Sequence, residues 1–172
     1  PQYNYFEDAV VNGKGVKVEC TADVAATINL TGIGYGFFYA YAYDPIAGAI
    51  STKVPITIND VTAPIITDYY SLAQIALDAS FATTVNEDAT VYIFAKGADV
   101  STEAKIATNA LYSFSVTGGE SVVNSMDSYK TKLPKGTVFQ FVAVDASGNI
   151  SAVVPTAGIT VADVALTIAS VS

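Results

Sequence analysis

The sequence contains no histidine, no tryptophan and no arginine, and it has a single cysteine. Without histidine, the chain lacks the side chain that proteins use most often as a general base and as a zinc ligand. Because Cys20 is the only cysteine, no disulfide can form within one chain. Its place in an alternating segment predicts a buried thiol on a β-strand. The alternative is a disulfide between two chains.

Charged residues are scarce, and most of them are acidic. Sixteen acidic residues and eight basic ones give a net charge of −8, while 51% of the 172 residues are apolar. Nucleic acid requires clustered basic side chains, and the one small cluster, Lys130, Lys132 and Lys135, does not outweigh the acidic field. The sequence therefore argues against a nucleic-acid partner, whereas its acidic balance permits divalent cations.

Long apolar runs are also missing. No stretch of about 18 apolar residues occurs, so no membrane-spanning helix is predicted. The apolar side chains must then be buried in cores or in contacts between proteins, which favours self-association. Residues 1–4 do not resemble a signal peptide, which leaves a processed secreted protein, a fragment or a cytosolic protein. The Thr-, Ser-, Val- and Tyr-rich composition favours the first two, and we expect an extracellular, cell-surface location.

What the sequence does have is a segment, residues 32–44, in which residue size alternates with a period of two. Strict alternation over this length predicts a β-strand, because successive side chains leave a strand on opposite faces. One face carries small residues and a single aromatic ring: Gly34, Gly36, Phe38, Ala40 and Ala42. The other face is an aromatic ladder, and this name is used below for Tyr35, Phe37, Tyr39, Tyr41 and Tyr43.

The rest of the chain also alternates, so the predicted class is all-β. Asn12-Gly13 predicts a hairpin turn. Strands are predicted at 16–21, 25–30, 50–58, 65–70, 74–81, 90–96, 111–116, 121–126, 137–144 and 159–162, with a short helix as an alternative within 99–110. The polar segment 59–64, which ends in a proline, predicts a boundary between a short unit, 1–62, and a longer unit, 63–163.

An internal repeat links the two units. An offset of 101 residues superimposes Phe139–Asp145 on Phe38–Asp44, and Ile150-Ser151 then falls near Ile50-Ser51. Since glutamine is seldom buried, Gln140 indicates that Phe139 and Phe141 face the core on the opposite side of the strand. Applied to the first unit at the same offset, this assignment of faces predicts that Phe38, Ala40 and Ala42 face a core. Tyr39, Tyr41 and Tyr43 are then predicted to face outward.

The repeated segment Phe139–Ser151 resembles the last strands of bacterial Ig-like domains, which recur in surface-layer proteins, adhesins and other exported repeat proteins. Asp60–Pro64 is similar to the linker that opens such domains. The resemblance implies two tandem Ig-like antiparallel β-sandwich units, the first of them short. It also implies adhesion, scaffolding or carbohydrate binding as the range of functions.

Residues 164–172 alternate beyond the second unit, with Leu166 and Ile168 on one side. Such a segment pairs with the nearest open sheet edge. Our hypothesis is that it is donated to a neighbouring subunit. The alternative is that it pairs within its own unit.

Three interpretations of the aromatic ladder remain open: a protein interface, a strand covered by another part of the chain, and a platform for sugar rings. Calcium is the cation that the acidic loops favour, with oxygen ligands from Asn59, Asp60 and Asp68 at the linker and from Asp145 and Asn149 in the repeated hairpin. The Asp145 loop has a simpler explanation as a turn.

No catalytic arrangement is recognisable. The neighbouring carboxylates Glu7-Asp8 and Glu87-Asp88 stand near no identifiable nucleophile, so an enzyme is not expected. The sequence thus predicts an extracellular structural protein that self-assembles into a surface layer or filament, with copies of itself as partner. The alternative is a surface adhesin or carbohydrate-binding module, with a cell-wall glycan as partner.

Overall fold

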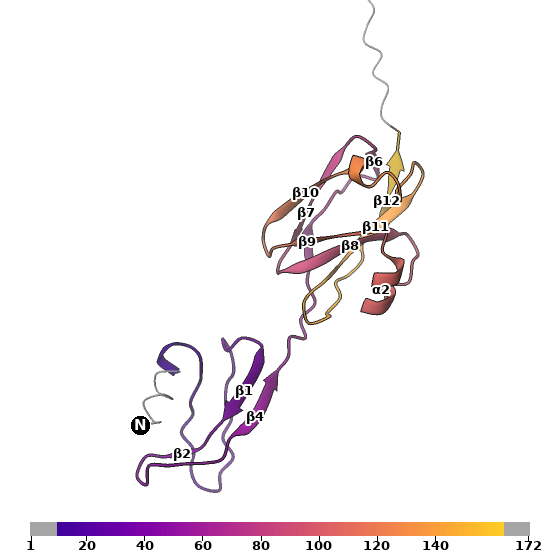
Figure 1. The fold of residues 1–172 in the computed structure, drawn as a ribbon. Coiled ribbons are helices and arrows are strands. Elements are labelled where there is room, and N and C mark those ends of the chain that lie inside the picture. Colours follow the sequence, from indigo (N-terminus) through magenta and orange to yellow (C-terminus); the bar gives the residue numbers. More distant parts are fainter. Residues whose placement is uncertain (1–9, 164–172) are drawn as a thin grey trace, which may run out of the picture. The chain divides into compact units, whose positions relative to one another are not determined.

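The computed structural model of the protein describes residues 10–163 (Figure 1). The chain divides into unit 1, Pro1–Asp60, and unit 2, Val61–Ser172. Unit 1 ends two residues before the boundary predicted from the sequence. The segment 164–172, with the donated strand hypothesised from Leu166 and Ile168, lies outside the described residues.

Unit 1 contains one long antiparallel hairpin. Its outer part pairs β1 (Gly36–Ala40) with β4 (Val54–Ile58), and its tip pairs β2 (Tyr43–Asp44) with β3 (Ala49–Ile50). Between the two pairs, the returning strand carries one more residue than the outgoing strand, which is the count of a β-bulge.

Several predictions for unit 1 are wrong. Segments 16–21 and 25–30 form no strands, and Val10 and Val11, before the Asn12-Gly13 turn, are helical rather than part of a hairpin. Cys20 is exposed instead of buried on a strand. None of residues 10–60 is buried, so the described part of unit 1 offers no core against which such segments could pack.

Between residues 61 and 163, unit 2 is all-β apart from a short α-helix and a 3-10 helix. Its smaller sheet has the order β10 (Ser121–Ser125), β7 (Ser80–Val85), β5 (Ile66–Asp68). Its larger sheet has the order β6 (Gln74–Ala76), β12 (Val154–Ala162), β11 (Val138–Val144), β8 (Ala89–Ala95), β9 (Tyr112–Val116). All neighbours are antiparallel except β12 and β6, which are parallel.

The main core of unit 2 is formed by side chains from both sheets. Phe81 of β7 contacts the rings of Phe139 and Phe141 of β11, with centroid distances of 6.5 and 5.4 Å. Ile75, Val85 and Ile159 belong to the same buried cluster. Apolar residues at alternate positions of each strand thus hold the two sheets together.

A second buried cluster covers the other face of the larger sheet. It contains Phe94, Val142 and Val144 of the sheet together with Ile106 of α2 (Glu103–Asn109). Thr102 caps this helix, because its hydroxyl accepts a hydrogen bond from the Lys105 amide at 3.3 Å. β11 is therefore covered on both faces and paired along both edges.

Gln140 corrects one step of the sequence reasoning. It is buried, with 6% of its surface exposed, although the repeat argument placed it on an outward face. Its amide donates hydrogen bonds to the carbonyl oxygens of Pro155 and Thr156 at 2.9 and 3.1 Å, so a buried glutamine is satisfied here. The core positions assigned to Phe139, Phe141 and Ala143 are correct.

Candidate interaction surface

The aromatic ladder is exposed along β1. Tyr35 and Phe37 each have 61% of their surface exposed, and Tyr39 and Tyr41 have 44%. Large rings of this kind are normally covered in a folded protein, so four consecutive exposed rings mark the surface as unusual.

The opposite face of β1 differs from the sequence prediction. Phe38 and Ala40 are half-buried and Ala42 is exposed. The prediction that these three residues face a core is therefore wrong. None of residues 10–60 is buried, so this face has no core to join in the described part of unit 1. Tyr43, predicted to face outward, is half-buried where it pairs with Ile50.

Contacts within the ladder hold its centre in one arrangement. The rings of Phe37 and Tyr39 meet edge to face, with centroids 5.0 Å apart and planes at 87°. The ammonium group of Lys53 lies 4.5 Å from the centre of the Tyr39 ring, which is a cation–π geometry. Sequence reasoning missed Lys53, because nothing in the sequence pairs it with Tyr39.

One edge of the β1–β4 sheet is suited to accept a further strand. Among the described residues β1 pairs with β4 alone, so its second edge carries backbone groups that no strand satisfies. β4 contains Pro55, which lacks a backbone N–H, and proline is characteristic of sheet edges that take no further strand. The open edge of β1 is therefore the better acceptor.

The internal repeat predicted from the sequence reappears as the same hydrogen-bonded hairpin. In unit 1 the Ser51 hydroxyl accepts from the Ala42 amide at 2.9 Å and donates to the Thr52 carbonyl at 2.9 Å. In unit 2 the Ser151 hydroxyl accepts from the Ala143 amide at 2.8 Å and donates to the Ala152 carbonyl at 2.9 Å.

The registers beyond the serines agree as well. Ala40 pairs with Val54 in unit 1, and Phe141 pairs with Val154 in unit 2. β1 is thus the counterpart of β11. The ladder corresponds to the face of β11 that bears Val142 and Val144 and lies under α2 in unit 2. No counterpart of α2 covers the ladder among residues 10–60.

The carboxylate predicted to bind calcium at Asp145 is occupied by its own loop. It accepts hydrogen bonds from the amides of Ser147 and Asn149 at 2.8 and 2.9 Å and from the Asn149 side chain at 2.8 Å. Desolvation by burial raises the pKa of Asp145, but hydrogen bonds from Asn149, Ser147 and Gly148 outweigh it, and the net effect is a lowered pKa.

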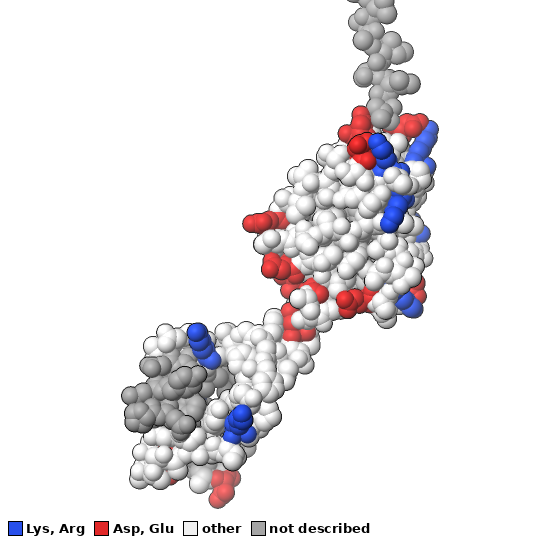
Figure 2. All heavy atoms as spheres, viewed as in Figure 1, with Lys and Arg blue, Asp and Glu red and all other residues white. Residues whose placement is uncertain are grey.

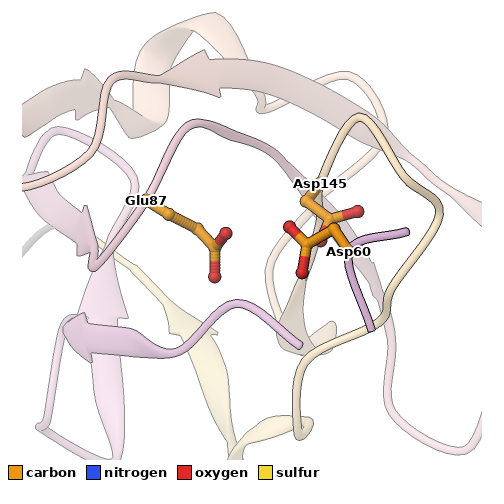
Figure 3. Close-up of side chains that lie close together, drawn as sticks. All are labelled: Asp60, Glu87 and Asp145. Atoms are coloured by element: carbon orange, nitrogen blue, oxygen red, sulfur yellow. The ribbon is translucent and has the colours of Figure 1, made fainter. Parts of the chain in front are cut away.

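Two carboxylates of unit 2 approach each other. Carboxylate oxygen atoms of Glu87 and Asp145 lie within 4.8 Å of one another, and both side chains are drawn in Figure 3. Calcium takes six to eight oxygen ligands, and two carboxylates supply only a part of such a set. Calcium binding by Asp145 and Asn149 therefore stays a prediction.

The other predicted calcium ligands are Asp68 of unit 2 and Asn59 and Asp60 of unit 1. Asp68 is exposed at the end of β5, opposite Thr84, and belongs to no group of three such carboxylates among the described residues. Asn59 and Asp60 end unit 1. Calcium binding by Asn59, Asp60 and Asp68 therefore stays a prediction.

Figure 2 shows lysines and acidic residues in small patches separated by uncharged surface. No helix among residues 10–163 is long and apolar enough to cross a membrane. No known protein-family model matches the chain, and no curated protein resembles it significantly.

Proposed function

We propose that the protein is a non-catalytic structural protein of the cell surface, which self-associates through the aromatic ladder of unit 1 into a layer or filament. The observation that carries this proposal is the contrast between the units. In unit 2 both faces of β11 are buried, whereas the equivalent β1 exposes its rings and none of residues 10–60 is buried.

Energetics support a partner for the ladder. Burying each large apolar side chain contributes roughly 1.5–3 kcal/mol. The hydroxyl groups of Tyr35, Tyr39 and Tyr41 can keep hydrogen bonds at the rim of a contact while their rings are buried. The edge-to-face packing of Phe37 on Tyr39 reduces the rotamer entropy that binding would otherwise cost.

The Ig-like assignment belongs to the same proposal. In its favour are the resemblance of Phe139–Ser151 to Ig-like domains, the two facing sheets of unit 2 and the recurrence of the serine hairpin in unit 1. Ig-like repeats serve as scaffolds and as adhesive modules, and an extracellular location accompanies both roles.

The test is a loss of assembly caused by changes in the ladder. We expect the purified chain to sediment as a concentration-dependent oligomer and to form ordered sheets or fibres in negative-stain microscopy. Replacing Phe37 and Tyr39 by serine removes two exposed rings and should shift the chain to monomer. Val123→Ser is the matched control, because Val123 is 70% exposed on β10 of unit 2. Oligomers that survive the double change would disprove the proposal.

A carbohydrate-binding role is the second candidate, and the same rings favour it, since sugars stack on exposed aromatic faces. A glycan array distinguishes the two. Binding of the monomeric wild-type chain to defined glycans, lost in the same double variant, would support the adhesin function instead.

A further inference from the structure

Unit 2 shows which strands lie on the two edges of β11, the counterpart of β1. β11 lies between β12 and β8, and its contact with β8 is antiparallel, with Phe139 opposite Ala95 and Phe141 opposite Ile93. β1 has the counterpart of β12, which is β4, and no counterpart of β8 among residues 10–60. The repeat thus predicts an antiparallel strand on the open edge of β1.

We propose that β1 of a second copy of the chain supplies this strand, so that two β1 strands pair antiparallel across a two-fold axis at Phe38. The proposal rests on the self-association proposed above and specifies one of its contacts. It produces a continuous four-stranded sheet with the order β4, β1, β1 of the second copy, β4 of the second copy.

The sequence of β1 fits a copy of itself. Gly36 and Ala40 are the small ends of the strand, and the rings lie between them. With Phe38 opposite Phe38 of the second copy, the small ends face each other and all five strand residues are paired. A shift by two residues would leave part of the strand unpaired, and a shift by one would place rings opposite the small face.

Charge also permits the pairing. β1 and β4 carry no charged residue, so no like charges meet across the two-fold axis. In the proposed register Phe37 lies directly opposite Tyr39 of the second copy. The two ladders become one aromatic face, whose cross-strand pairs extend the edge-to-face contact of Phe37 and Tyr39 already present in each copy.

A two-fold contact closes on itself, so it forms one link of a layer or filament rather than the whole assembly. The competing occupant is a strand like β8. A synthetic peptide with the sequence of residues 88–96 represents this occupant in the test.

Disulfide trapping measures the register. In a Cys20→Ser background, Phe37→Cys and Tyr39→Cys chains are oxidised separately and as a mixture. Residues directly opposite on antiparallel strands have Cα atoms about 4.5–5.5 Å apart, within the range that a disulfide spans. Two cysteines at the same position of the two copies, 37 with 37 or 39 with 39, are offset by two residues along the strands. Their Cα atoms are then more than about 7 Å apart, too far for a disulfide. Val123→Cys on β10 controls for random collision.

We expect the mixture to give roughly tenfold more cross-linked dimer than either variant alone or than Val123→Cys, because a disulfide forms only between opposed residues. Equal yields in all samples would overturn the pairing. Assembly of the mixed cysteine variants, confirmed by sedimentation, without this selective cross-link would disprove the register while leaving self-association intact. Saturable binding of the 88–96 peptide to a monomeric chain would overturn the second copy as occupant, and a monomer at all concentrations would disprove both proposals.

Discussion

The two serines of the repeated hairpin offer an experiment with its control built into the chain. Ser151→Ala and Ser51→Ala remove the same hydroxyl group from the same pattern of hydrogen bonds. The two positions differ in solvent access, since Ser151 is 7% exposed and Ser51 lies on the surface. We expect the first change to destabilise the protein far more than the second.

The size of the effect follows from the groups left behind. Without the Ser151 hydroxyl, the amide of Ala143 loses its acceptor at a position with 0% exposure, and an unsatisfied buried donor costs about 1–3 kcal/mol. Ala152 is an exposed residue, so its carbonyl can bind water instead. In unit 1 water can replace the hydroxyl at Ala42, so Ser51→Ala should change the free energy of unfolding by no more than about 0.5 kcal/mol.

Thermal unfolding measured by calorimetry and by near-ultraviolet circular dichroism provides the assay. For a unit of this size, a loss of 1–3 kcal/mol corresponds to a fall of about 4–12 °C in the melting temperature. Equal shifts for the two variants, or no shift for Ser151→Ala, would refute the reasoning that burial determines the cost of losing this hydroxyl.

Two further changes in unit 2 have predictable results. The Thr83 hydroxyl is buried without a hydrogen-bond partner, so Thr83→Val should raise the free energy of unfolding by about 1 kcal/mol in urea titrations, whereas Thr84→Val on the half-buried face should have little effect. Hydrogen bonds from Lys105 and Ser101 lower the pKa of Asp99 to about 2. Because the folded pKa is depressed, this contribution to stability is full above about pH 4 and is lost as the pH falls towards 2. Asp99→Asn should therefore reduce the fall in melting temperature between about pH 4 and pH 2. An unchanged fall would contradict the assignment of this pH dependence to Asp99.

The strands of unit 2 could be predicted from the sequence because alternation there coincides with burial. Residues 137–144 alternate between two apolar clusters, and β11 forms where it was expected. The predicted strand 74–81 is divided into β6 and β7, because the amide of Ala79 bonds to the carbonyl of Ala76 in a turn. The helix considered within 99–110 forms, capped by Thr102.

Unit 1 was less predictable, because strand formation depends on partners more than on composition. Residues 16–21 and 25–30 have the alternation of strands and form none, since none of residues 10–60 is buried. The exposure of the ladder from Tyr35 to Tyr41 agrees with the register that the repeat transferred from unit 2. The premise that Gln140 faces outward was nevertheless wrong. Gln140 is buried through hydrogen bonds to backbone carbonyls 15 and 16 residues further along the chain, and no sequence pattern reveals such partners.

The parallel pairing of β6 with β12 has a mechanical consequence. The chain enters β6 at Gln74 and leaves β12 at Ala162, and the two strands point the same way, with Thr160 opposite Gln74. A pull that stretches unit 2 between these two points slides one strand past the other. Their hydrogen bonds then bear the load together instead of opening one at a time. Tension between Gln74 and Ala162 is thus opposed by the strand pair that joins the first strand of this sheet to its last.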